Sequence, residues 1–103
     1  MVDVYQIPLE VLPNQSLTIR LSSSRYLIAI KMLSDALMAI SITRDDILLI
    51  QNERLVPSTL LLPEHQALGY GNFMFTTPED AYPHYSGFDN GHELYFIPLG
   101  DGE

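Results

Sequence analysis

The side chains that could do chemistry in this sequence are few, and the three histidines come first. His65, His84 and His92 are the only imidazoles in the chain. A zinc site needs several such ligands that converge on one point, usually with short fixed spacings. No two of the histidines have such a spacing, although Asp89 and Glu93 lie close to His92 in the sequence. We therefore interpret the histidines as polar loop residues and predict no metal or other cofactor.

Catalytic motifs are equally sparse. The Gly-x-Ser-x-Gly motif of serine hydrolases is absent, and residues 69–71 lack the further glycines and the following helix of a dinucleotide-binding loop. The carboxylate pairs Asp45-Asp46 and Glu79-Asp80 are adjacent in sequence. Because neighbours in an extended chain point to opposite faces, such pairs seldom act together on one glycosidic bond. We predict no catalytic site and no enzyme activity.

Aromatic side chains give the one functional hypothesis that the residues themselves support. Tyr82, Tyr85 and Phe88 lie between Pro78 and His92, in a stretch whose prolines, glycines and Asp/Asn residues are typical of a loop. A loop of this length in a compact domain is usually functional or disordered. The three rings could pack on the domain as a lid. They could instead anchor a neighbouring subunit, because aromatics are enriched at interface centres, and they are our candidate partner interface.

Length and composition restrict the class of protein. The chain has 103 residues, 47% of them hydrophobic, and no cysteine, which predicts one globular domain over residues 1–103 without disulfides. The first residues lack the basic and apolar segments of a signal peptide. No apolar run approaches the roughly 20 residues that span a bilayer. We therefore expect no membrane partner.

The acidic charge is unevenly distributed along the chain. The net charge is −8, and all five basic residues lie in the first 54 positions, where six acids leave a net of −1. The remainder has seven acids and no Lys or Arg, which gives −7. Nucleic-acid binding needs clustered Lys and Arg, so we expect no stable binding of nucleic acid.

Alternating hydrophobic residues organise the chain around residues 17–43. Leu17, Ile19 and Leu21 share one face of an extended segment and polar residues share the other, which is typical of a half-buried strand. Residues 25–33 predict a second strand with apolar residues on both faces, so we expect cover on both sides. Residues 37–43 predict a third strand. The helical spacing of Leu33, Leu37 and Ile40 leaves a helix open there, although β-branched residues favour the strand.

Four shorter segments complete the predicted strands: residues 4–9, 47–50, 73–77 and 93–97. Pro8 and Pro13 confine the first of them to a sheet edge. The continuous apolar run at 47–50 predicts a buried strand, which residues 51–54 bend. Residues 60–62 predict a buried turn of irregular or 3₁₀ backbone. The chain is therefore predicted to be all-β, a small OB-like or SH3-like antiparallel β-barrel of about six strands.

Four stretches in sequence order carry a resemblance to one small protein family. They are Ile7-Pro8-Leu9 with residues 13–21, Arg25-Tyr26, residues 46–50 and 54–57 with Leu61-Leu62-Pro63, and residues 71–75 with 83–88 and 94–96. With these motifs the chain resembles the plug-like baseplate proteins of contractile-tailed bacteriophages, of the cyanophage baseplate plug type. The likeness covers nearly the whole chain.

The resemblance implies an OB-like barrel and a structural role at the axis of the tail, where copies help to close the tube or hub until infection. It implies no catalysis, and it favours the strand at 33–43. It also implies baseplate hub and tail tube proteins as partners, a homo-oligomer in the assembly, and a place in the virion tail or baseplate, with the host cytoplasm as the site of assembly. The acidic C-terminal part could then face the lumen, where like charge would keep DNA from sticking.

A function from another class stays open beside this one. An OB-like module could bind oligosaccharide or single-stranded nucleic acid on aromatic platforms. The absence of a basic groove counts against nucleic acid.

Overall fold

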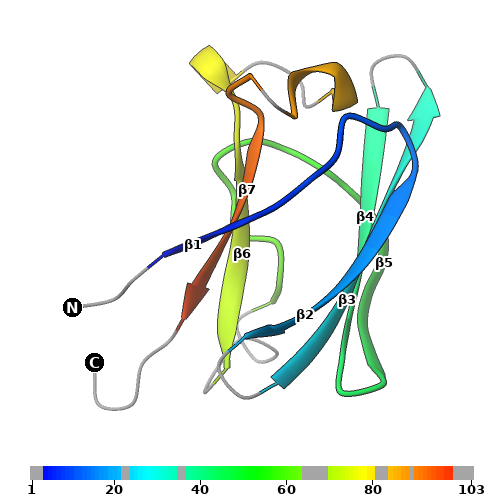
Figure 1. The fold of residues 1–103 in the computed structure, drawn as a ribbon, viewed down its shortest axis with the longest axis vertical. Coiled ribbons are helices and arrows are strands. Elements are labelled where there is room, and N and C mark those ends of the chain that lie inside the picture. The colour runs from blue at the N-terminus through cyan, green and yellow to red at the C-terminus, as the bar shows by residue number, and fades with distance from the viewer. Residues whose placement is uncertain are drawn as a thin grey trace.

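The structure, a computed structural model, describes residues 4–21, 24–34, 37–63, 70–80, 84–88 and 90–98. These residues form seven strands and two short 3₁₀ turns (Figure 1). The elements are β1 (Tyr5–Ile7), β2 (Gln15–Leu21), β3 (Ser24–Ser34), β4 (Leu37–Arg44), β5 (Ile47–Arg54), β6 (Gly71–Thr76), η1 (Pro78–Asp80), η2 (Tyr85–Gly87) and β7 (Glu93–Pro98). Within these ranges no helix has the length and apolar character needed to cross a membrane.

The strands form two antiparallel sheets that face each other (Figure 1). Strands β2, β3, β4 and β5 make a four-stranded meander in that order, since each pairs with the next strand in the chain. The second sheet has the order β1-β7-β6, so β7 lies between the first and the sixth strand. The all-β prediction is therefore confirmed, and β1 is an edge strand as the two prolines indicate.

The core fills the space between the sheets with aromatic and β-branched side chains. Tyr26 on β3, Phe73 on β6 and Phe96 on β7 are fully buried and contact one another, with ring centroids 5.1–5.6 Å apart. Edge-to-face and tilted arrangements of this kind contribute beyond the burial of their surface. The three rings thus fasten the four-stranded sheet to the three-stranded one.

Strand β4 resolves the choice between helix and strand. Met38, Ile40 and Ile42 alternate along it and are buried in the core. Ile40 lies opposite Ile30 and Ile42 opposite Ile28 on β3, so the apolar faces of the two strands coincide. An extended segment buries these three side chains on one face, and the strand prediction for residues 37–43 is confirmed.

The outer face of the four-stranded sheet corrects two predictions. Strand β3 was expected to be covered on both sides, yet Leu27 is 44% exposed on the face away from the core. The run at 47–50 is the predicted strand but only partly buried, because Ile47 is 66% and Leu48 52% exposed while Ile50 lies in the core. Leu27 and Leu48 therefore lie at the surface, whereas Ala39, opposite Lys31, is buried.

The segment that leaves β5 corrects a third prediction. It is irregular as expected, but it runs along β6 instead of forming a buried turn. Pro57 pairs with Phe75 and Leu60 with Met74 as isolated bridges, and the Leu61 N–H donates to the Phe73 carbonyl at 2.9 Å. Of the three leucines only Leu62 is buried, and Leu60 is exposed.

A buried asparagine holds this segment to β6. The side chain of Asn72 accepts from the Leu62 N–H at 2.8 Å and donates to the Leu62 carbonyl at 3.0 Å. The same oxygen accepts from the Phe73 N–H at 2.7 Å. One amide therefore satisfies three backbone groups that would otherwise be buried without partners.

Replacing Asn72 by alanine is expected to lower the free energy of unfolding by about 2 kcal/mol, because the substitution leaves those backbone groups unpaired. Urea denaturation measures the change. Asn14→Ala is the matched control, since the exposed Asn14 side chain accepts one bond, from the Met32 N–H at 3.1 Å. Equal losses for the two variants would show that burial of the Asn72 amide contributes nothing special.

Candidate partner interface

The structure describes some of the candidate interface residues in the 78–92 loop and not others. Phe88 is 5% exposed, and its ring meets Phe75 edge to face at 5.9 Å. This is the packing role that the sequence left open as a lid. Tyr82 lies outside the described residues, and of Tyr85 only the backbone is described, in η2. Whether these two tyrosines contact a partner stays a prediction.

Hydrogen bonds of backbone and imidazole groups order the loop next to Phe88. The Gly87 carbonyl accepts from the N–H groups of Asn90 at 2.8 Å and of His92 at 2.9 Å. The His92 Nδ1 accepts from the His84 N–H at 3.2 Å, which requires a neutral His92 ring. Gly87 has no side chain, and a Cβ at this position would lie 2.2 Å from the nearest atom of the His92 ring. The ring therefore packs directly on the backbone of η2.

Burial lowers the pKa of His92, and the nearby His84 lowers it further. The unfolded chain takes up a proton on this ring near pH 6.5, whereas the folded chain resists it to lower pH. The stabilisation from His92 is then complete above about pH 6.5 and is lost as the pH falls below that value.

We therefore expect the wild-type chain to lose more stability between pH 7.5 and pH 5 than His92→Asn does. Because His92→Asn lacks this titrating group, the difference between the pH profiles of the two chains reports His92 and not the thirteen carboxylates that both share. Urea denaturation at both pH values measures this difference. Parallel pH profiles would contradict a lowered pKa in the folded state.

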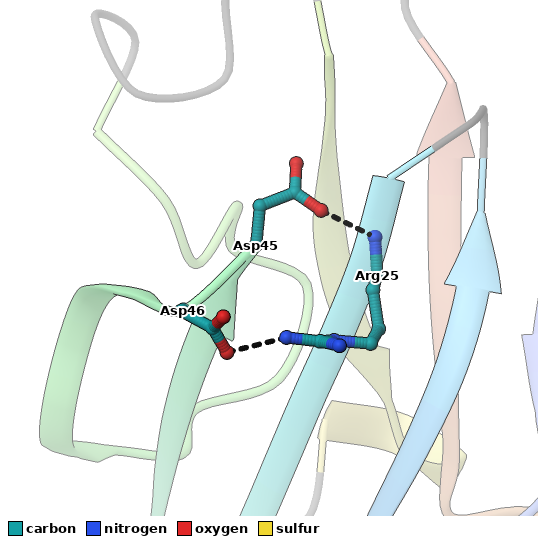
Figure 2. A network of polar contacts seen from close by, with 3 residues as sticks. All are labelled: Arg25, Asp45 and Asp46. Carbon is teal, nitrogen blue, oxygen red and sulfur yellow. Dashed lines mark hydrogen bonds and ion pairs between the residues drawn. The ribbon is translucent and has the colours of Figure 1, made fainter.

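The turn between β4 and β5 carries a second polar network, shown in Figure 2. Asp45 and Asp46 have φ values of 50° and 70°, as in the two-residue turns that match the twist of a hairpin. Asp45 Oδ1 accepts from the Arg25 N–H at 2.9 Å, and its own N–H donates to the Arg25 carbonyl at 2.8 Å. The Arg25 guanidinium forms an ion pair with Asp46. The turn is thereby fixed to the start of β3.

Beside this turn lies a shallow hollow of about 240 Å³ on the outer face of the four-stranded sheet. Its lining comes from three neighbouring strands and the turn: Thr18, Arg25, Leu27, Thr43 and Asp46. Thr18 lies opposite Leu27, and Leu27 opposite Thr43, so the three form one row across the sheet. The hollow thus has Leu27 between two threonines and the Arg25–Asp46 ion pair at one end.

Arg44, the last residue of β4, makes a further contact of this hairpin, on the other side of the sheet. Its guanidinium lies 3.5 Å from the centre of the Tyr70 ring, a distance typical of a cation–π contact. Arg44 is also opposite Tyr26 in the sheet register. Burial raises the pKa of Tyr26, and the positive charge of Arg44 partly opposes that rise.

Chemistry of other kinds has little geometric support. Among the side chains that the structure describes, no three His, Asp or Glu residues lie close enough to hold a metal ion. Glu79 and Glu93 lie on η1 and β7, and the Tyr95 hydroxyl donates to the Glu93 carboxylate. Asp89 and the side chain of Asp80 are outside the described part.

Two features of the outer sheet face are not predicted from the sequence, the contacts of Arg25 with the Asp45-Asp46 turn and the hollow. The sequence shows Asp45 and Asp46 only as adjacent carboxylates and Arg25 as the start of a strand, and the lining of the hollow depends on which residues stand opposite each other. The signal that could have indicated the ion pair is the Asp-Asp turn, which returns the chain beside β3 at Arg25.

Comparison with known proteins gives one informative result. No curated protein matches the chain. Residues 4–99 match the family model described as cyanophage baseplate Pam3 plug gp18. This match covers every strand of both sheets, and it agrees with the resemblance found in the motifs. The chain belongs to the cyanophage baseplate Pam3 plug gp18 family.

Proposed function

We propose that this chain is a structural component of a contractile phage or prophage tail baseplate, where it plugs or lines the central axis of the hub or tube through protein–protein contacts. The family match over residues 4–99 carries the proposal. Membership indicates a structural baseplate plug and a location in the virion baseplate. The contractile type of tail and the position at the axis are our extension of that role.

The surface of the four-stranded sheet supports a function in assembly. Leu27 on β3 and Leu48 on β5 are exposed on its outer face, and Ile47 is exposed at the start of β5. Exposed apolar side chains gathered on one region of a protein commonly mark a contact with another protein. The proposed partners are hub and tail tube proteins and further copies of this chain, which assemble in the host cytoplasm.

The 78–92 loop is a second proposed contact region. Phe88 would hold the loop on the core while Tyr82 and Tyr85 meet the partner. This division of roles is supported by the burial of Phe88 against Phe75, and by the frequency of tyrosine at interface centres.

We also propose that the two sheets correspond to the OB-like barrel implied by the resemblance. The bridges of Pro57 and Leu60 to β6 support it, since this segment joins the end of β5 to the edge of the second sheet.

The charge distribution supports a definite orientation in the assembly. Residues 1–54 carry all five basic residues and six acids, a net of −1, and the C-terminal part, residues 55–103, carries seven acids and no Lys or Arg, a net of −7. We propose that the acidic part faces the lumen, where it repels DNA. An assembled structure with that part buried against protein would contradict this orientation.

The alternative of an OB-like binding module has less support. Stacking of bases or sugars needs aromatic rings at the surface, and Phe73, Phe75 and Phe96 are all buried. Tyr5 and Tyr70 are the exposed rings among the described side chains, and they lie on β1 and just before β6.

Light scattering tests the proposed function most directly. The molar mass of the chain is measured alone and after mixing with each purified baseplate protein encoded beside it. We expect a defined complex with at least one of them. A monomer that binds none of these proteins, and that instead binds labelled oligonucleotide or oligosaccharide saturably, would favour the binding module.

A further inference from the structure

The two sheets have four edges, and three of them are protected against pairing with another chain. Strand β1 is three residues long, and β6 is covered by the segment with the Pro57 and Leu60 bridges. Strand β5 is bulged twice, with register shifts opposite Ile42 and a φ of 53° at Asn52. Short length, cover and bulges are three of the devices that keep sheet edges from adding strands.

Strand β2 is the fourth edge and has none of these devices. It is seven residues long, and its register with β3 is regular from Gln15 opposite Ile30 to Leu21 opposite Ser24. Leu17 and Ile19 face the core but are only partly buried. A further strand placed beside β2 would complete their cover.

The backbone groups that face the free edge follow from the hydrogen bonds of β3. The Arg25 N–H and carbonyl both bond to Asp45, on the side of β4. Successive residues in an antiparallel strand turn these groups to opposite sides. The N–H and carbonyl groups of Tyr26 therefore point toward β2, where Tyr26 pairs with Ile19. The same alternation on β2 turns the groups of Ser16, Thr18 and Arg20 away from β3. In the described part of the chain nothing pairs with them.

The side chains at this edge lack an anion. Arg20 lies directly opposite Arg25 on the outer face, in a pair of the closely spaced kind. Arg25 is held by Asp46, whereas the exposed Arg20 side chain forms no ion pair or hydrogen bond with the residues that the structure describes. Like charges opposite each other destabilise a strand pair, and a carboxylate next to Arg20 would offset that repulsion.

We propose that β2 receives an extended segment of another baseplate protein by strand addition, and that this segment places an Asp or Glu beside Arg20. The proposal rests on the assembly role proposed above. A second copy of β2 fits less well, because its sequence from Gln15 to Leu21 contains no carboxylate. Backbone bonds to Ser16, Thr18 and Arg20 would give affinity, and the carboxylate would give specificity.

Two pairs of variants test this arrangement. Thr18→Pro removes an N–H that points to the free edge and spares the ladder to β3, whereas Thr18→Val keeps the N–H. Arg20→Glu reverses the edge charge. Lys31→Glu makes the same change on the exposed face of β3, an interior strand, and serves as its control.

Binding is measured against each purified baseplate protein encoded beside this chain, at two salt concentrations. We expect Thr18→Pro and Arg20→Glu to weaken the wild-type complex about 10-fold or more, and the two controls to change it less than about 3-fold. In the complex, hydrogen exchange of the Ser16, Thr18 and Arg20 amides should slow at least about 10-fold. A Lys in place of the partner's carboxylate should restore binding to Arg20→Glu.

The outcomes separate this proposal from the proposed function. A complex that forms equally well with Thr18→Pro and Thr18→Val, or with Arg20→Glu and Lys31→Glu, leaves the assembly role standing and overturns strand addition at β2. Self-association that Thr18→Pro abolishes assigns the edge to a second copy and overturns the acidic partner. Absence of any complex with the wild-type chain contradicts the assembly role and this inference together.

Discussion

Phe96→Ala is expected to lower the free energy of unfolding by about 4 kcal/mol. Phe96 lies on β7, the central strand of its sheet, and is fully buried between Tyr26 and Phe73. The substitution removes the ring that the other two contact and leaves a cavity where the two sheets meet. The two neighbouring rings are themselves fully buried, so the surroundings can close the cavity only in part.

Urea denaturation of Phe96→Ala, Phe96→Leu and Leu48→Ala measures this effect. Phe96→Leu retains much of the volume and should lose less than half as much stability. Leu48 is about half exposed, so Leu48→Ala should cost less than about 1 kcal/mol. A loss below about 2 kcal/mol for Phe96→Ala would mean that the sheets are held together elsewhere.

Gly71→Ala is expected to cost about 3 kcal/mol, for two reasons that add. Gly71 opens β6 with a φ of 137°, a conformation that L side chains rarely adopt. A Cβ at this position would also lie 2.5 Å from Cζ of Phe96 and 3.0 Å from the Ile97 carbonyl oxygen. The Phe96 ring has no room to withdraw, since it is packed in the aromatic cluster.

A double-mutant cycle separates the two reasons. Gly71→Ala should cost less in the Phe96→Ala background, because the ring that the new methyl group meets is gone. Gly91→Ala is the surface control, with a φ of 93° and a Cβ that would meet only Pro78, at 2.9 Å. If Gly71→Ala costs the same in both backgrounds, the backbone conformation and the Ile97 carbonyl cause the loss, and the Phe96 ring does not.

The strands themselves could largely be predicted from the sequence. Leu17, Ile19 and Leu21 share the inner face of β2, and Tyr26, Ile28 and Ile30 share that of β3, as their alternation indicates. The period of two in side-chain direction is a local property, so it can be read without knowing the partner strand. The same reasoning identified β4 once its β-branched residues were weighed against its helical spacing.

What the sequence could not indicate is how the strands combine. The apolar run of β5 predicts burial, yet Ile47 and Leu48 are exposed, and a register shift beside Ile42 places Leu48 opposite Thr43. A bulge depends on the register of two strands, which no single segment encodes. For the same reason the hollow, which three strands line, had no sequence signal.

The candidate interface was predictable only in part. The loop aromatics were recognisable by type, but the burial of Phe88 depends on Phe75, which lies on another element. Arg20 looked like any solvated charge. Its significance arises only when the register places it opposite Arg25 at an uncovered edge.

The pairing of β1 with β7 has a consequence for how the chain is made. Tyr5 lies opposite Phe96 and Ile7 opposite Leu94, so β1 cannot pair until β7 has been synthesised. The four-stranded meander joins neighbours in sequence and can form early, whereas this closing pair spans almost the whole chain. A product that stops before residue 93 lacks the middle strand of this sheet, which leaves β1 without a partner strand and β6 with only the bridges to Pro57 and Leu60.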